Sequence, residues 1–295
     1  MFHVDTFTRE RFSGNPAVAV LAADALTDDE MHRLANELHR GDTVFVTRPE
    51  SREHDLRLRF FTPTREVPFI GHCTLAAHYA LGCDGAERPR HVRQETGAGV
   101  IDVEVRGAGE ERTIAMTLSP PTLGRMLDER ERTQVLDALG LSTVELDGAC
   151  PMQIAFKGGS RLLIGLKSAR RLDALKPDLA VLKRLSVHLG ADGFFVFARE
   201  GAADGCLTES RMFCPAIGID EDPVSGNAHG MLAVYFHAHA LVSVTGGRAR
   251  FQGLQGRALG RLGRVDIELK VADAHVASVT VAGQAVLVYR TTVSL

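Results

Sequence analysis

The sequence predicts an α+β protein made of two similar halves, each with strands wrapped on one apolar helix. Arg59–Pro63 (RFFTP) returns as Arg211–Pro215 (RMFCP), and both copies continue to a Pro-x-x-Gly sequence. The residues that follow each Pro-x-x-Gly, including 75–81 and 231–236, are apolar on nearly every face. Helices of that kind are buried on all sides. Two such helices therefore indicate two cores.

Two further blocks of sequence are repeated in the same order. Arg33–Val46 matches Arg184–Val196 at an offset of about 150, which sets Asp42 opposite Asp192. A later block, GVIDVEV from Gly99, matches GRVDIEL from Gly263. Matching blocks at a slowly growing offset are typical of an internal duplication.

The boundary between the halves is predicted near Ser119-Pro120-Pro121, where the strand signals stop and a charged helical stretch begins. A Pro-Pro pair is a natural boundary between domains. The predicted domains are residues 1–119 and 120–279.

The elements of the first half can be predicted in order. Residues 3–7 alternate like a strand, and Gly14-Asn15-Pro16 turns the chain into the apolar run 17–21. Residues 27–30 form a capping box before an amphipathic helix. Residues 42–46 then read as a strand that opens on the carboxylate of Asp42. An Asp just after a helix is also a common turn residue, so both interpretations stay open at this point.

The two Pro-x-x-Gly sequences carry the chemical hypothesis. They place Gly71-His72 and Gly226-Asn227 at the starts of the two buried helices. The first N–H groups of a helix lack partners within it and lie at the positive end of its dipole, so they suit a carboxylate or enolate. Two such ends that face one another would form one anion-binding cleft. The alternative is that Pro and Gly are ordinary helix-start and turn residues.

Composition excludes several function classes. The chain has 295 residues, 45% of them hydrophobic, and a net charge of −3, which gives no electrostatic footprint for nucleic acid or an anionic membrane. No apolar run reaches the roughly 18 residues needed to span a bilayer. The first residues, MFHVDTFT, lack the form of a secretory signal, so a cytoplasmic protein is expected.

The cysteines and histidines argue against a disulfide framework and a metal site. The five cysteines are an odd number, widely spaced and without a Cys-x-x-Cys sequence, so reduced thiols are expected. The twelve histidines show no His-Glu-x-x-His spacing. No metal and no organic cofactor are predicted. Cys73, at a helix start, is either an acidified thiol at the site or a packing residue.

Several motifs together resemble the PhzF-like (phenazine biosynthesis) family. They are GNPAVAV near the start, RFFTPTREVPFIGH, RMFCPAIGIDEDPVSGNA and QGRALGRLG, and the likeness covers nearly the whole chain. The resemblance implies a fold shared with diaminopimelate epimerase. In that fold two pseudo-symmetric domains each form a curled, mostly antiparallel sheet or barrel around a central helix, with the active site between them. It also implies that residues from about 280 to 295 return to the first domain, and that the protein forms homodimers.

The resemblance assigns roles to particular residues. The family's general acid/base is a Glu at the position of Asp42, and its site also includes the positions of His72 and Asp222. Asn227 stands where the family has a Ser. The full predicted site is catalytic Asp42, His72 and Asp222, with Gly71, Cys73, Gly226, Asn227 and Asn15 binding substrate.

Two departures from related patterns affect the predicted mechanism. Asp42 is one methylene shorter than the family Glu, and a displacement of about 1 Å can cost on the order of 100-fold in rate. Diaminopimelate epimerases also place a Cys before the helix-start Gly in each half. Here those positions hold Ile70 and Ser225, so a two-thiol racemase is not expected.

The sequence therefore predicts a cofactor-independent isomerase of EC class 5. It would use carboxylate general acid/base chemistry on a small carboxylate-bearing, amino-acid-like metabolite in the cleft between the domains. The alternatives are a lyase or hydratase on the same site, and a small-molecule-binding protein that kept the fold without efficient turnover. The expected partners are a small-molecule substrate and a second copy of the chain, with no nucleic acid and no membrane.

Overall fold

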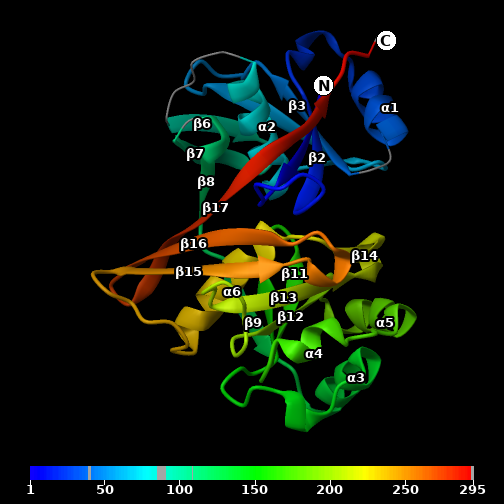
Figure 1. The fold of residues 1–295 in the computed structure, drawn as a ribbon, viewed down its shortest axis with the longest axis vertical. Coiled ribbons are helices and arrows are strands. Elements are labelled where there is room, and N and C mark those ends of the chain that lie inside the picture. Colours follow the sequence, from blue (N-terminus) through cyan, green and yellow to red (C-terminus); the bar gives the residue numbers. More distant parts are fainter. Residues whose placement is uncertain (39–40, 85–90, 108, 294–295) are drawn as a thin grey trace. The chain divides into compact units, whose positions relative to one another are not determined.

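The computed structural model describes residues 1–38, 41–84, 91–107 and 109–293. The chain divides into two compact units (Figure 1). Unit 1 comprises Met1–Leu118 and Ala282–Leu295, and unit 2 comprises Ser119–Val281. The last two residues of the predicted returning segment, 294 and 295, lie outside the described residues.

Unit 1 is a ring of strands around one helix. Its strands pair in the order β1-β2-β3-β4-β6-β7-β8-β17, and β17 pairs with β1, which closes the ring. The β2–β3 and β4–β6 pairs of this ring are parallel. The elements are β1 (Phe2–Thr6), β2 (Asn15–Val20), α1 (Asp28–Leu38), β3 (Asp42–Thr47), β4 (Leu56–Phe61), β5 (Glu66–Val67), α2 (Gly71–Cys83), β6 (His91–Thr96), β7 (Gly99–Arg106), β8 (Thr113–Leu118) and, from residue 282 on, β17 (His275–Arg290), whose first residues belong to unit 2.

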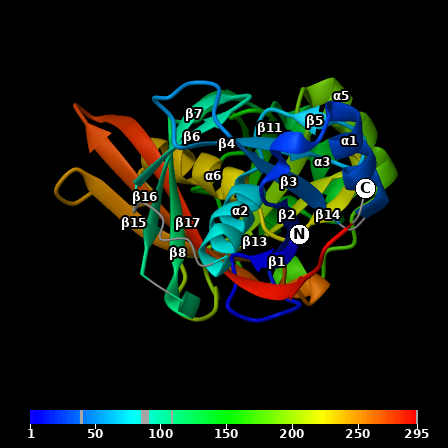
Figure 2. The same cartoon turned by 90° about the horizontal axis from the view of Figure 1, so that it is seen from above.

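The helix α2 fills the ring because nearly all of its faces are apolar. Its residues from Cys73 to Leu81 are all buried, and Figures 1 and 2 show it running through the middle of the unit's strands. Gly283 on β17 allows the close approach, since a Cβ there would lie 3.0 Å from a side-chain carbon of Leu75. The predicted α+β fold with a central helix is confirmed.

Unit 2 repeats this plan. Its ladder runs β9-β10-β11-β12-β13-β15-β16, and its two parallel pairs, β11–β12 and β13–β15, correspond to the two of unit 1. The buried helix is α6. The elements are β9 (Thr122–Met126), α3 (Glu129–Leu139), β10 (Gln153–Phe156), β11 (Ser160–Leu166), α4 (Arg170–Asp173), α5 (Leu179–Leu189), β12 (Gly193–Ala198), β13 (Thr208–Cys214), β14 (Ile219–Asp222), α6 (Gly226–Ala238), β15 (Arg248–Gln255) and β16 (Gly263–Ala272).

The structure shifts the sequence match between Asp42 and Asp192 by one residue. Helix α1 ends at Leu38 and β3 begins at Asp42, whereas α5 ends at Leu189 and β12 begins at Gly193. Both helices have 11 residues and both strands begin four residues after the helix ends. The structural counterpart of Asp42 is therefore Gly193, and Asp192 precedes it.

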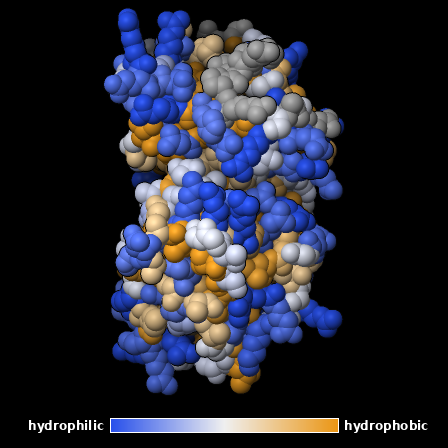
Figure 3. Space-filling view, turned by 90° about the vertical axis from the view of Figure 1, so that its left-hand side faces the viewer, coloured by the Kyte–Doolittle hydropathy of each residue, from blue (hydrophilic) through white to orange (hydrophobic). Residues whose placement is uncertain are grey.

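Polar residues cover much of the surface, and no described helix is both long and apolar enough to cross a lipid bilayer. Hydrophilic side chains spread over the face drawn in Figure 3, with smaller apolar patches between them.

Both units contain an equivalent arginine–glutamate pair, which joins β4 to β5 in unit 1 and β13 to β14 in unit 2. In unit 1 the Nε and Nη2 atoms of Arg59 donate to the two carboxylate oxygens of Glu66, at 2.8 and 2.7 Å. In unit 2 Arg211 makes the same two bonds to Glu221, at 2.9 and 2.7 Å. Each guanidinium also lies over a phenylalanine two residues later in its strand, and this places a desolvated cation on an aromatic face.

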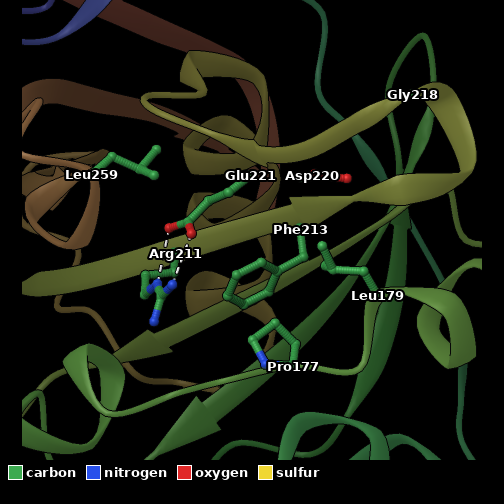
Figure 4. A pocket seen from close by; sticks show the side chains of 8 residues that line it. All are labelled: Pro177, Leu179, Arg211, Phe213, Gly218, Asp220, Glu221 and Leu259. Atoms are coloured by element: carbon green, nitrogen blue, oxygen red, sulfur yellow. Dashed lines mark hydrogen bonds and ion pairs between the residues drawn. The ribbon is translucent and has the colours of Figure 1, made fainter.

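The pair in unit 2 is the more enclosed of the two. The Arg211 and Glu221 side chains are 10% and 11% exposed, against 15% and 43% for Arg59 and Glu66. Arg211 Nη1 also donates to the backbone oxygens of Leu172 and Leu175, at 2.8 and 3.0 Å. Figure 4 shows the pair at the wall of an open pocket of about 430 Å³. Bidentate geometry and low exposure make this pair a structural anchor.

We expect Arg211→Met to lower the apparent free energy of unfolding by about 3 kcal/mol, because it leaves a buried carboxylate and two carbonyls unpaired. Arg59→Met is the matched control. It should cost less, because water reaches the Glu66 carboxylate. Urea unfolding followed by circular dichroism measures both, and equal losses would contradict the argument from burial.

Candidate active site

Asp42 is the first residue of β3. Its partner in the parallel β2–β3 pair is Ala17, a buried residue with a small side chain. The Asp42 side chain is 22% exposed. The carboxyl group therefore lies at the rim of the ring of strands and remains accessible to solvent.

His72 faces this carboxylate from the start of α2. The distance from His72 Nε2 to Asp42 Oδ2 is 3.6 Å, and the imidazole is 14% exposed. Burial lowers the pKa of His72 to about 4. At neutral pH the imidazole is therefore neutral, so it can accept or donate a hydrogen bond but carries no charge.

Cys73 completes a cluster with these two residues. One donor atom from each of Asp42, His72 and Cys73 lies within 4.8 Å of the others. The Cys73 side chain is fully buried, and burial together with the Asp42 charge raises the pKa of its thiol well above the usual value. The thiol is therefore protonated at neutral pH and is a poor nucleophile.

The same three donors are of the types that Zn²⁺ accepts in proteins. A metal ion would need the Cys73 thiol to lose its proton inside a buried site. The prediction that this site holds no metal stays a prediction.

The start of α2 offers backbone donors beside the cluster. Ile70 occupies the N-cap position and, in the part of the chain that the structure describes, provides no side-chain cap. The start of α6 differs, because the Ser225 hydroxyl accepts from the Ala228 N–H at 3.2 Å. The first N–H groups of α2 and its dipole therefore favour a negative group near His72.

In unit 2 a buried glutamine organises the segment before α6. Gln255 accepts from the Ser225 N–H at 3.1 Å and donates to the Asp222 backbone oxygen at 2.7 Å. Asn227, the second residue of α6, donates to the Lys157 backbone oxygen at 2.8 Å. Asp222 and Asn227 are both half-buried.

The predicted site residues thus fall into two groups, each within one unit. Unit 1 brings together Asp42 and the helix-start residues Gly71, His72 and Cys73. Asn15, also in unit 1, is buried at the start of β2, where its backbone oxygen accepts from Thr6 at 2.8 Å. Unit 2 holds Asp222, Gly226 and Asn227. Their predicted catalytic and binding roles stay predictions.

Sequence reasoning missed Gln255 and Lys157. Gln255 opens the QGRALGRLG motif, so the sequence carried a signal for it. Lys157 lies in the turn between β10 and β11, and its link to Asn227 depends on a backbone oxygen, which no residue pattern reveals.

Comparison with known proteins supports one family. The signature of the family described as "Phenazine biosynthesis-like protein" (PhzC-PhzF) matches residues 4–291. A protein of Clostridium acetobutylicum named as an uncharacterized isomerase is 38% identical over 290 residues, 98% of this chain and 96% of its own. The trans-2,3-dihydro-3-hydroxyanthranilate isomerase of Pseudomonas aeruginosa is 30% identical over 95% of this chain and 94% of its own.

A solved structure leads to the same family. The crystal structure of a PhzF-family phenazine biosynthesis protein from Bacillus anthracis superposes with a TM-score of 0.89 and 27% sequence identity, covering 100% of this chain and 98% of the other. The chain therefore belongs to the family of phenazine biosynthesis-like proteins, has their epimerase-like fold and is an enzyme of the isomerase class.

Proposed function

We propose that this isomerase moves a proton between two carbons of a small, carboxylate-bearing, amino-acid-like compound, with Asp42 as the general acid/base and no organic cofactor. The observation that carries the proposal is the Asp42–His72 contact of 3.6 Å at the start of α2, where both side chains remain partly exposed. A carboxylate within reach of solvent and beside a neutral imidazole can exchange a proton with a bound compound.

The proposed reaction conserves every atom of the substrate. Asp42 removes a proton from a carbon next to an activating group, and the electrons of that C–H bond form a new double bond. The existing double bond shifts, and Asp42 returns the proton to a second carbon. His72 stays neutral, so it can orient a substrate hydroxyl or amino group without pairing permanently with the carboxylate.

The backbone supports the charge that develops during this step. When the proton leaves, negative charge spreads over the substrate's unsaturated system. The N–H groups of Gly71 and His72 lie at the positive end of α2, a helix of 13 residues. Fixed donors of this kind stabilise a developing anion without reorganisation.

The name of one relative supports the proposed substrate class. The Pseudomonas aeruginosa relative is named for trans-2,3-dihydro-3-hydroxyanthranilate, a cyclic amino acid with a carboxylate. We propose a substrate of this class, with Asp222, Gly226, Asn227 and Asn15 as further binding residues. A thiol-based racemase is disfavoured because Cys73 keeps its proton.

The first prediction concerns Asp42. With trans-2,3-dihydro-3-hydroxyanthranilate in deuterium oxide, the wild-type protein should introduce deuterium at substrate carbon, measured by proton NMR. Asp42→Asn should reduce this rate about 100- to 10,000-fold, because the general acid/base is lost. Asp42→Glu, which keeps the carboxylate, should retain exchange.

The exposed, helix-surface change Asp29→Asn is the matched control and should leave exchange unchanged. Equal rates for Asp42→Glu and Asp42→Asn would refute the assignment of the base. A product that has lost water would instead indicate a lyase.

The second prediction concerns pH. Burial favours the neutral imidazole of His72, so its lowered pKa means that it gains a proton only as the pH falls to about 4. Protonation of His72 should therefore leave kcat/KM unchanged from about pH 8 to pH 5.5, and it should reduce kcat/KM below that range. An NMR titration, with the His72 signal assigned by its loss in His72→Gln, checks this. A midpoint near 6.5 would show that the imidazole is solvated.

A further inference from the structure

The side chains of Asp42, His72 and Cys73 offer three different metal-ligating atoms at one place. They are the only group of three or more His, Cys, Asp or Glu side chains with such spacing in the described part of the chain. Asp42 begins β3, and His72 and Cys73 are the second and third residues of α2. Carboxylate, imidazole and thiolate are the ligand types that Zn²⁺ accepts in proteins.

The spacing of the donor atoms is close to that of a zinc site. Tetrahedral zinc, with bonds of about 2.0 Å to nitrogen or oxygen and 2.3 Å to sulfur, holds neighbouring ligand atoms roughly 3.3 to 3.6 Å apart. The distance from Asp42 Oδ2 to His72 Nε2 is already 3.6 Å. All three donor atoms lie within 4.8 Å of one another. An approach of the Cys73 sulfur by roughly 1 Å therefore closes the three ligands around an ion.

The cluster is buried on the side of the thiol and accessible on the other. The Cys73 side chain is fully buried, whereas the Asp42 and His72 side chains are 22% and 14% exposed. An ion can therefore enter past Asp42 and His72 and reach the thiol. Three protein ligands leave the fourth position of a zinc site for a water molecule.

The charges of these ligands suit a divalent ion. When Zn²⁺ binds Cys73, the thiol proton is released to solvent, because a thiol that coordinates zinc is deprotonated. The thiolate and the Asp42 carboxylate then balance the two positive charges of the ion. The positive end of the α2 dipole therefore meets a neutral centre, which it does not repel.

The packing of a buried helix in this fold does not require these three donors. Helix α6 has 13 residues, as α2 has, and its second and third residues are Asn227 and Ala228. The counterpart of Asp42 in unit 2 is Gly193. Ala228 is fully buried, so an alanine fills the place that Cys73 takes in unit 1. The cluster is thus a feature of unit 1 and not of the duplicated fold.

We propose that Asp42, His72 and Cys73 form a reversible binding site for Zn²⁺. The ion takes no part in the proposed proton transfer, since a carboxylate that holds zinc cannot accept a proton from a substrate carbon. Zinc is therefore expected to inhibit the isomerase. This consequence, unlike the binding itself, rests on the proposed function of Asp42.

The test is isothermal titration calorimetry of the reduced, metal-free full chain with zinc chloride. The wild-type protein should bind a single zinc ion per chain and should not bind magnesium, which prefers six oxygen ligands. Cys73→Ala, which introduces the residue of unit 2, should weaken zinc binding at least about 100-fold, since losing a ligand costs more than losing an outer-shell partner. His72→Gln keeps the thiol and should also weaken binding at least about tenfold.

Titration with Co²⁺ identifies the sulfur ligand directly. Cobalt bound to a thiolate gives an ultraviolet charge-transfer absorption band, which the wild-type protein should show and Cys73→Ala should lack. Zinc should also raise the thermal unfolding midpoint of the wild-type protein, because it binds the folded state, and should leave that of Cys73→Ala unchanged.

Cys83→Ser is the matched control. Cys83 is the last residue of α2 and is exposed, so it is the thiol on the same helix that would bind a metal adventitiously. This variant should keep the wild-type zinc affinity and the cobalt band. Zinc binding that survives in Cys73→Ala, or that is lost in Cys83→Ser, would overturn the proposal. A wild-type protein that binds zinc no better than magnesium would do the same.

Deuterium exchange with and without zinc separates this site from the proposed function. If Asp42 is the base, zinc should suppress exchange in the wild-type protein at the concentration at which it binds. Zinc that binds through Cys73 and leaves exchange unchanged would refute Asp42 as the base while the metal site stands.

Discussion

Each unit must enclose a helix that is apolar on nearly every face, and this constraint determines the rest of its fold. Every side chain of α2 from Cys73 to Leu81 leaves water, and a two-layer packing could cover only one side of such a helix. Strands must surround it, so the sheet of unit 1 curls until β17 meets β1. Once the helix is enclosed, only its ends reach the rim of the ring. The chemically useful residues therefore gather where α2 begins.

The same constraint explains why function can vary while the fold is kept. The duplicated unit repeats its parallel strand pairs, its 11-residue outer helix and its Arg–Glu anchor. The first residues of the parallel pair lie at the rim, where packing is less demanding. Unit 1 has Ala17 and Asp42 there, and unit 2 has Arg161 and Gly193.

The sequence predicted what depends on local pattern. The repeated blocks and the two Pro-x-x-Gly helices predicted the fold class. The resemblance to the PhzF-like family pointed to Asp42 and His72, which the structure places 3.6 Å apart. It could not predict contacts that depend on register. The sequence match at an offset of about 150 set Asp42 against Asp192, yet strand pairing makes Gly193 its counterpart. Gln255 was visible within a motif, but its two bonds to the Asp222–Ser225 segment depend on tertiary placement.

The two rim positions also differ in how they balance charge. At Asp42 the carboxyl group faces an imidazole whose pKa burial lowers to about 4, so the imidazole adds no positive charge there at neutral pH. At Arg161 the guanidinium instead faces the carboxylate of Asp192, 3.9 Å away, which accepts from the Ser160 N–H. The two units therefore place opposite charges in the same partner pair of the same parallel strands. This difference at the rim, rather than one in the packed interior, separates the two units chemically.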